Sequence, residues 1–475
     1  MKAKRYGSDT KLSNVIYFLR RFGWLHVTVF AVVTVSAFSG KTGTVGHRRN
    51  KKSPSVQVQQ QQQPSLHTKL QNCFTPTSIL ENIAVLVTPK VDPSASLSSL
   101  ALIRLSKQII ALDNENNEYL INDNNKQLWK EGLRNLVSCL ASSNWKASPK
   151  SLETAVEGVK AASVISRLVS SDYLVSSNND NTNGKVWWEP LVEKLHEEAD
   201  DQLVRMIQPH QLSGIKFSID CIQLSSSTKQ DASDLLSSSH QPQYLLPQSL
   251  QIAYDNLNLP FSVRPGFLNG NDDDDDDDVD NKHNNNLFTV ASFVKQVNFQ
   301  IETIQTATNR TVAERRQTAW EGDEHVENFE YSEKSMRRLP WSDVVANVRD
   351  RLYNETSHYY DGCLLNFYPD GDSAMRYHID PDQGVLWDYE TAVVSIGATR
   401  RFSFRESSSG NGSNKPHVFV LMNGDVTEMF NDCQERFQHT VQKSSVKGES
   451  ASRVSLVFKK TLGYSKERTK SRTKV

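Results

Sequence analysis

The stretch LLNFYPDGDSAMRYHID, residues 364–380, carries the pattern that decides the fold and the chemistry of this chain. It reads as a strand over 363–368, a turn over 369–371, and a second strand that carries His378 and Asp380. Side chains alternate along a strand, so these two lie on the same face. An imidazole and a carboxylate placed in this way can occupy two adjacent positions of one divalent ion. The stretch therefore predicts two of the ligands of a metal site.

A third ligand would complete a 2-His-1-carboxylate triad, which leaves three metal positions open for a co-substrate and oxygen. The strand-rich remainder of the chain offers His417 and His439. His417 opens a strand after a loop of Gly, Ser and Asn, whereas His439 lies in a short strand-like segment just after an apolar strand and its turn. We favour His439.

Size and composition set broad limits on the rest of the chain. Its 475 residues suffice for two or three domains, and a net charge of -1 provides no overall steering toward nucleic acid. The five cysteines are odd in number and widely spaced, without a CxxC pair. This pattern supports neither a disulfide framework nor a zinc ribbon and favours a reducing compartment.

The N-terminal segments resemble targeting sequences. Residues 1–37 are signal-like, with basic residues before the apolar run 24–35, which is too short for a membrane span. Residues 38–69 are transit-like, then Gln-rich and disordered. The pair resembles the bipartite presequences of algae with complex plastids, so we expect a plastid protein without a stable membrane span in its mature form. Mitochondrial, secretory and nuclear destinations remain as alternatives.

Residues 70–223 predict an all-α region, because apolar residues recur there at intervals of three and four. The segment 207–224 faintly resembles a helix of the helical repeats in organellar RNA-binding proteins, so this region could contact RNA or a protein partner. A plain helical domain whose partner surface is unknown is the simpler interpretation. Residues 224–257, rich in Ser, Gln and Pro, read as a linker.

Residues 258–465 predict a second domain, in which a helical entry precedes eight short β-rich segments. The fold class is therefore α+β and multidomain, an α-helical region followed by a jelly-roll sandwich with room for a metal between its sheets. The Asp- and Asn-rich stretch 271–286 reads as a solvated acidic loop, and 466–475 as a disordered basic tail.

The order of motifs in this second domain resembles the AlkB family of Fe(II)- and 2-oxoglutarate-dependent dioxygenases. The motifs are NFY, HxD, SIGATRRFSFR, NGDVTEMF, QERFQH and RVSLVFK, preceded by ERRQTAWEGD, which looks like the nucleotide-lid region of the family. The resemblance implies a double-stranded β-helix that uses Fe(II), 2-oxoglutarate and O2. It assigns the iron to His378, Asp380 and His439, and 2-oxoglutarate to Asn366, Tyr368 and Arg453.

The last strand departs from the family pattern, because Ser455 and Lys459 stand where the best-known members have Asn and Arg. Lys459 keeps the positive charge of the arginine but loses its planar fork. Both residues are still expected to contact 2-oxoglutarate. On the substrate side, Asp382 matches a position that can hydrogen-bond the base in family members.

Two further residues are candidates for substrate contacts. Trp320 could stack on a flipped base or fill the edge of the sandwich. Arg401, like Arg400 and Arg405, could contact phosphates or lie on a solvated face.

The function expected from these features is oxidative demethylation of N-alkylated bases in DNA or RNA, with release of succinate, CO2 and formaldehyde. The target base must be in a single strand or flipped out of a duplex to reach the metal. Two alternatives remain open: an AlkB-like dioxygenase that acts on protein or lipid, and an organellar RNA-binding protein whose dioxygenase-like module does not catalyse.

Overall fold

The computed structural model describes residues 69–70, 73, 75–84, 94–114, 125–169, 186–227, 245–269, 288–305, 310–331, 334–407, 415–445 and 448–462. The described residues all belong to one compact unit, within residues 63–475. The predicted targeting segments (apart from Lys69), the acidic loop 271–286 and the basic tail 466–475 lie outside the described residues.

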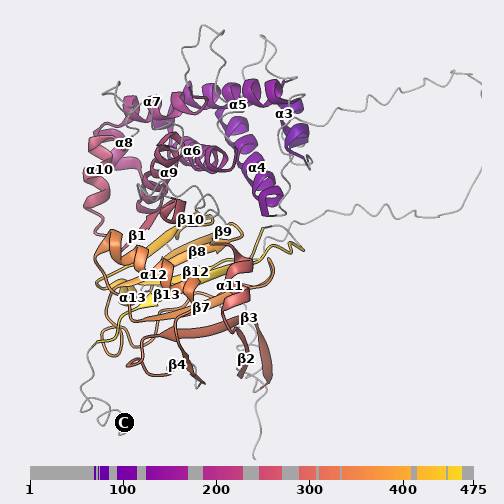
Figure 1. The fold of residues 1–475 in the computed structure, drawn as a ribbon. Coiled ribbons are helices and arrows are strands. Elements are labelled where there is room, and N and C mark those ends of the chain that lie inside the picture. The colour runs from indigo at the N-terminus through magenta and orange to yellow at the C-terminus, as the bar shows by residue number, and fades with distance from the viewer. Residues whose placement is uncertain are drawn as a thin grey trace, which may run out of the picture. The chain divides into compact units, whose positions relative to one another are not determined.

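The first part of the unit is helical, as drawn in indigo to magenta in Figure 1. One hydrophobic cluster joins its helices and includes Trp129, Trp187 and Trp188, so these tryptophans are packing residues. By length and composition alone α4 could cross a membrane, but one of its faces, with Leu102, Leu105 and Ile109, is buried in this cluster. The α-helices are α3 Pro76–Ala84, α4 Ala95–Asn114, α5 Lys126–Ala141, α6 Pro149–Leu168, α7 Glu189–Glu198, α8 Asp201–Met206, α9 Pro209–Ser227 and α10 Gln248–Asp255, with a 3-10 turn at Trp145–Ala147.

The expected linker over 224–257 is partly helical. α9 continues through its first residues to Ser227, and α10 occupies Gln248–Asp255. Leu250 is fully buried in the same cluster as the other helices. The Ser and Gln content of this segment suggested a loop, but burial of one apolar face is enough to stabilise a short helix by tertiary packing.

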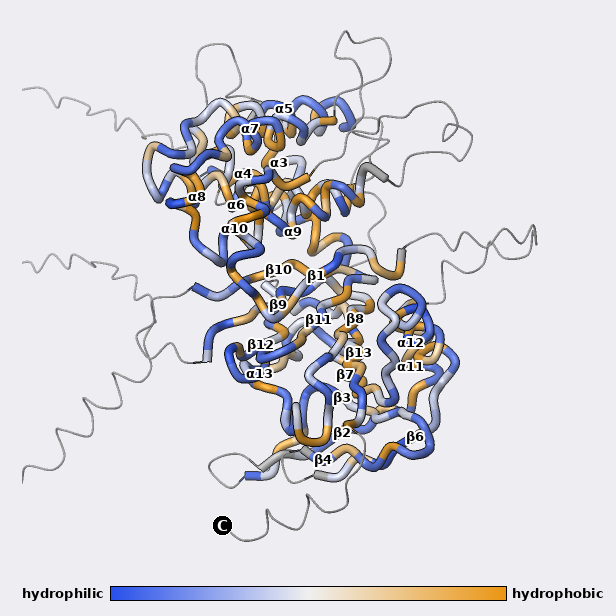
Figure 2. The backbone as a smooth tube through the Cα atoms, turned by 90° about the vertical axis from the view of Figure 1, so that its left-hand side faces the viewer, coloured by the Kyte–Doolittle hydropathy of each residue, from blue (hydrophilic) through white to orange (hydrophobic). Residues whose placement is uncertain are grey.

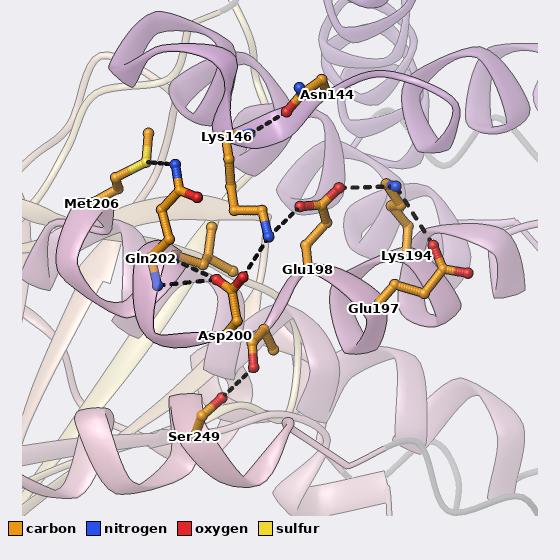
Figure 3. Close-up of polar contacts among 11 residues, drawn as sticks. Asn144, Lys146, Lys194, Glu197, Glu198, Asp200, Gln202, Met206 and Ser249 are labelled. Carbon is orange, nitrogen blue, oxygen red and sulfur yellow. Dashed lines mark hydrogen bonds and ion pairs between the residues drawn. The ribbon is translucent and has the colours of Figure 1, made fainter.

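The turn from α7 to α8 is fixed by polar contacts, shown in Figure 3. The Lys146 ammonium lies 3.0 Å from Glu198 and 2.8 Å from Asp200. Asp200 caps α8 by accepting hydrogen bonds from the backbone N–H groups of Gln202 and Leu203. Lys194 bonds Glu198 from one turn earlier at 2.9 Å. This network closes a corner of the helical region.

The second part contains two β-sheets. The larger is ordered β1-β11-β8-β13-β7-β3-β2, antiparallel along this path, and β6 pairs with β3 in parallel. The smaller is ordered β10-β9-β12 and is antiparallel throughout. Two facing antiparallel sheets of this kind are consistent with the predicted jelly-roll.

The strands of the larger sheet are β1 Phe261–Arg264, β2 Gln300–Gln305, β3 Thr311–Gly322, β6 Arg338–Leu339, β7 Gly362–Tyr368, β8 Thr391–Gly397, β11 Val426–Met429 and β13 Arg453–Lys459. Those of the smaller sheet are β9 Arg400–Glu406, β10 His417–Leu421 and β12 Phe437–Val441. A separate pair consists of β4 Phe329–Tyr331 and β5 Lys334–Met336, and the remaining helical segments are η3 Phe267–Asn269, α11 Val290–Gln296, α12 Asp343–Thr356 and α13 Cys433–Arg436.

The two faces of the larger sheet differ in character because side chains alternate along each strand. On β13, Val454, Leu456 and Phe458 pack in one cluster with residues of α11 and α12, which cover this face (Figure 1). In Figure 2 the orange colour of neighbouring β8 marks its hydrophobic residues. The other face carries Arg453 and Lys459, both 1% exposed, and turns toward the smaller sheet. Charged residues are therefore buried between the sheets.

The helical part contacts the sandwich through buried polar and aromatic side chains. Arg167 of α6 donates two hydrogen bonds to Asp425, at 2.9 and 2.6 Å, and both side chains are at most 5% exposed. Ser213 of α9 bonds His417 at 2.8 Å. Phe217 meets Phe419 edge-on, with ring centroids 5.5 Å apart. Because α9 covers β10, an edge strand of the smaller sheet, the two parts share a buried surface.

Candidate metal and co-substrate site

His378, Asp380 and His439 lie together, with one potential ligand atom from each within 4.8 Å of the others. Oδ1 of Asp380 is 3.7 Å from Nε2 of both histidines. One ion can bond a pair of atoms at this separation, since it is less than twice a metal–ligand bond of about 2.0–2.2 Å. The donor set of two imidazoles and one carboxylate is that of a facial triad. The residues present therefore fit a divalent iron ion.

The local backbone that brings these residues together differs from the prediction. Residues 374–380 do not form a strand; they make an isolated bridge in which His378 and His439 exchange backbone hydrogen bonds of 3.1 and 2.9 Å. His439 itself belongs to β12. The side chains of opposed residues in such a bridge point to the same side. The bridge therefore brings the ligand side chains to one side, as the predicted strand was expected to do.

Hydrogen bonds prepare His378 as a ligand. Its Nδ1 lies 2.8 Å from the carbonyl oxygen of Arg376, which can only accept, so Nδ1 carries the proton. The lone pair is then on Nε2, the atom that faces Asp380. Burial, assisted by the neighbouring His378, lowers the pKa of His439 to about 3, so this ring is neutral at physiological pH. His439 is thus in the form that binds a metal, and His378 presents Nε2 on the side of Asp380.

Asp380 is held by Lys459 on the other side. The ammonium of Lys459 donates to Oδ2 at 2.7 Å, and the two side chains are 1% and 10% exposed. Although burial alone would raise the pKa of Asp380, Lys459 and then His439 and His378 hold it well below its usual value. Lys459 therefore orients one oxygen of the carboxylate and leaves Oδ1 toward the histidines.

The structure brings His439, and not His417, to His378 and Asp380. His417 lies 6% exposed at the contact with α9, where it bonds Ser213. Both histidines begin as candidates because both lie on short strands, and these strands form the two edges of the smaller sheet. It is His439 of β12 that forms the bridge with His378.

The predicted co-substrate residues share the inner face of the larger sheet. Arg453 lies opposite Tyr368, and Ser455 lies opposite Asn366, on neighbouring strands β13 and β7. Arg453 donates to the carbonyl of Ala398 and to the Ser395 hydroxyl, while its Nε and the Ser455 hydroxyl are buried without a hydrogen-bond partner among the described residues.

Among the described residues, no acid lies within ion-pair distance of Arg453, and burial lowers its pKa to about 10. A buried, incompletely satisfied guanidinium is costly, and an anionic ligand would satisfy it. The side chains present therefore fit a carboxylate at this end of the inner face.

Trp320 is a packing residue. It is 0% exposed and lies against Phe329 and Trp387, with ring centroids 4.8 and 5.3 Å away. Its indole N–H donates to the carbonyl of Glu327 at 3.0 Å. The substrate role considered for Trp320 is therefore replaced by the structural one, because neither face of the ring is open to a base.

The arginines of β9 divide by face. Arg400 is buried and bonds Glu449 at 3.1 Å, so its proposed phosphate role is corrected to an internal ion pair. Arg405 is exposed, bonds Gln438 and lies 4.0 Å over the ring of Tyr377. Arg401 is exposed and remains a candidate for phosphate contact.

Asp382 lies two residues beyond Asp380 in a left-handed turn, with φ of 59°. Its carbonyl oxygen accepts hydrogen bonds from the N–H groups of residues 385, 386 and 387, which fixes the turn. The side chain is half-buried.

Sequence reasoning missed Arg316, Ser395 and Gln434. Arg316 of β3 donates to the amide oxygen of Asn366, Ser395 accepts from Arg453, and Gln434 accepts from the N–H of Asp380 at 2.8 Å. For Arg316 the signal was present: in RRQTAW, β-alternation puts it on the face of Thr318 and Trp320, and both are buried.

Comparisons with known proteins agree with this geometry. Residues 278–459 match the model of the 2OG-Fe(II) oxygenase superfamily. An uncharacterized protein of Acanthamoeba polyphaga mimivirus is 30% identical over 154 residues, which are 32% of this chain and 77% of that protein. The DNA oxidative demethylase of Bos taurus is 28% identical over 32% of this chain and 56% of its own length. An alpha-ketoglutarate-dependent dioxygenase of Mus musculus, alkB homolog 3, is 29% identical over 28% of this chain and 48% of its own.

The chain belongs to the AlkB-like branch of the 2OG-Fe(II) oxygenase superfamily. The expected resemblance is thereby confirmed, as is the expectation of a dioxygenase that uses Fe(II), 2-oxoglutarate and O2. The chain spans about half the length of the two alkB relatives named above. Within this AlkB-like domain, the three clustered residues are the group that fits the iron.

Proposed function

We propose that this protein is an oxidative demethylase of N-alkylated bases in DNA or RNA. The observation that carries the proposal is the clustering of His378, Asp380 and His439, together with the burial of Arg453, which has no acidic partner among the described residues. A relative named as a DNA oxidative demethylase supports nucleic acid as the substrate class.

In this proposal His378, Asp380 and His439 hold the iron, and Arg453 pairs with the distal carboxylate of 2-oxoglutarate. Asn366, Tyr368 and Ser455 supply further hydrogen bonds from the same inner face. When bound, iron and 2-oxoglutarate supply the oxidising power: O2 and 2-oxoglutarate are consumed, succinate and CO2 form, and the N-methyl carbon leaves as formaldehyde while the base keeps a proton. The protein positions the methyl carbon and excludes water from the reacting centre.

The substrate side is assigned to the residues that border the cluster. Asp382 would accept a hydrogen bond from the edge of an unstacked base, because its turn holds it next to Asp380. Arg401 would contact a backbone phosphate, which adds affinity without sequence preference. The helical part, which shares a buried surface with the sandwich, would contribute contacts to RNA or a protein partner.

The test is formaldehyde release by the full-length protein, supplied with Fe(II), 2-oxoglutarate and air. Substrates are matched single-stranded DNA and RNA oligonucleotides with and without N-methylated bases. We expect stoichiometric succinate and formaldehyde from a methylated strand and none from its unmethylated match. His378→Ala should abolish both products.

The matched control is His358→Ala, which removes an exposed histidine that pairs with Glu390 at 2.7 Å and should leave turnover unchanged. Succinate without formaldehyde from either nucleic acid would overturn the proposed substrate and favour a protein or lipid. No succinate from a folded, iron-loaded protein would overturn the demethylase proposal itself.

A further inference from the structure

Arg316 is buried beside the two residues assigned to 2-oxoglutarate on β7. It lies on β3, next to β7 in the larger sheet, with 8% of its side chain exposed. The guanidinium donates through Nη1 to the side-chain oxygen of Asn366, and through Nε to Glu314 at 3.0 Å. It also hydrogen-bonds the hydroxyl of Tyr368. One guanidinium thus contacts both neighbours of the expected carboxylate.

The direction of these hydrogen bonds follows from chemistry, because a guanidinium has donors and no acceptor. The amide oxygen of Asn366 must accept from Arg316, which leaves its NH2 group to donate elsewhere. The Tyr368 oxygen likewise accepts from Arg316, and its own hydrogen is left to donate. Both residues lie opposite β13, where Ser455 faces Asn366 and Arg453 faces Tyr368. The free donors therefore belong to the same inner face as Arg453.

Arg316 and Arg453 differ in whether an acid of the protein compensates their charge. Glu314, 10% exposed, forms an ion pair with Arg316, so the charge of Arg316 is compensated within the protein. Arg453 has no such acid among the described residues, and its Nε is buried without a partner. Arg453 is left to bind an anion, whereas Arg316 is left to orient its neighbours.

We propose that Arg316 is a positioning residue that makes the co-substrate face donate only, by holding the Asn366 amide and the Tyr368 hydroxyl as hydrogen-bond donors to a carboxylate of 2-oxoglutarate. This inference rests on the co-substrate assignment of the proposed function. A site that only donates should select 2-oxoglutarate over an analogue with an amide in place of the carboxylate. The carboxylate oxygens can accept every hydrogen bond, whereas the NH2 group of the amide would meet other donors and leave them unpaired.

The test measures binding, without turnover, by titration calorimetry on full-length protein loaded with Mn(II) under nitrogen. The two ligands are 2-oxoglutarate and its analogue with the C5 carboxylate replaced by an amide. We expect Arg316→Met to weaken 2-oxoglutarate binding roughly tenfold and to narrow the preference for acid over amide by a similar factor, since a freed Asn366 can turn its oxygen toward the ligand. Mn(II) affinity should be unchanged.

Two comparisons separate positioning from general destabilisation. Arg315→Met, next in sequence but 64% exposed beside Asp372, should bind both ligands like the wild type. Asn366→Ala should cost less in the Arg316→Met background than in the wild type, because the amide is already released there. If Arg316→Met does not fold, Asn366→Asp replaces it: this variant keeps the acceptor for Arg316 and loses the inward donor, so it should reject the carboxylate.

The possible outcomes distinguish a failure of the positioning role from a failure of the co-substrate assignment. Unchanged acid-over-amide preference in Arg316→Met, or additive losses in the double variant, would overturn the positioning role while the dioxygenase assignment stands. Tight acid binding by Asn366→Asp would overturn it as well. Failure of the wild-type protein to bind 2-oxoglutarate at all would instead overturn the co-substrate assignment on which the inference rests.

Discussion

Replacing Lys459 with Met should destabilise the metal-free protein far more than the metal-loaded protein. The ammonium of Lys459 lies 2.7 Å from Asp380, and the two side chains are 1% and 10% exposed. Removal of one partner of a buried ion pair costs about 3–5 kcal/mol, because the other charge stays buried and unpaired. A divalent ion on Asp380 supplies a replacement positive charge, so the loss should then fall to the roughly 1.5–3 kcal/mol of a charge-assisted hydrogen bond.

Thermal unfolding of wild-type and Lys459→Met proteins, each with chelator and with saturating Mn(II), measures this difference. For a domain of this size, 1 kcal/mol corresponds to about 2–4 °C, so the variant should lose on the order of 10 °C without metal and distinctly less with it. Lys460→Met is the control: its side chain is 53% exposed and 4.0 Å from Asp388, so we expect little change. Equal losses with and without Mn(II) would refute the reasoning that Lys459 acts as the counter-charge of Asp380.

Three further predictions concern the buried groups around the site. Arg167→Met should lower the free energy of unfolding by about 3–5 kcal/mol, because Asp425 stays buried without its counter-charge. A second substitution, Asp425→Asn, should restore part of this free energy, and additive losses in urea titrations would contradict the pairing. Burial lowers the pKa of His417 to about 4. The neutral ring therefore contributes about 3 kcal/mol of stability above pH 6.5, which is lost as the pH falls toward 4. His417→Gln should flatten the dependence of the unfolding free energy on pH in this range. Trp320→Ala should cost about 3–5 kcal/mol as a core truncation, whereas Trp320→Phe should leave affinity for single-stranded nucleic acid unchanged; a selective loss of affinity in Trp320→Phe would restore the base-stacking role.

The metal cluster could be predicted from sequence because its information is local. In an extended backbone an HxD triplet places its two ligands on the same side, whether or not the segment forms a regular strand. The structure holds it with a bridge to His439 rather than with a strand, and the same pair of side chains results. The choice between His439 and His417 depended on which strand neighbours the bridge, and the sequence pattern gave only a preference.

The rest depended on contacts between residues distant in sequence. Trp320 and Arg316 both lie on β3, in a segment read as a lid over the substrate, and nothing local shows that the segment is a strand inside the larger sheet. The polar run on β13 presents a similar difficulty, since an alternating strand with polar residues usually faces water. Here Arg453 and Lys459 face inward, and only their partners on β7, on β8 and at Asp380 show why.

The helical part shows the same limit. Periodicity identified its helices, but the buried pair of Arg167 and Asp425 joins residues 258 positions apart, so sequence alone suggested two parts joined by a linker. Experiments on this protein should therefore use the full chain, because a fragment that begins near 258 would expose Asp425 and the edge strand β10.

The most direct test of the central claim is an anaerobic titration of the full-length protein with Fe(II) and 2-oxoglutarate, followed by visible absorption. We expect a metal-to-ligand charge-transfer band that needs both additions, is lost in His378→Ala and His439→Ala, and is retained in His417→Gln. A folded protein that binds neither, or a band that survives in His439→Ala and disappears in His417→Gln, would contradict the assignment of the site.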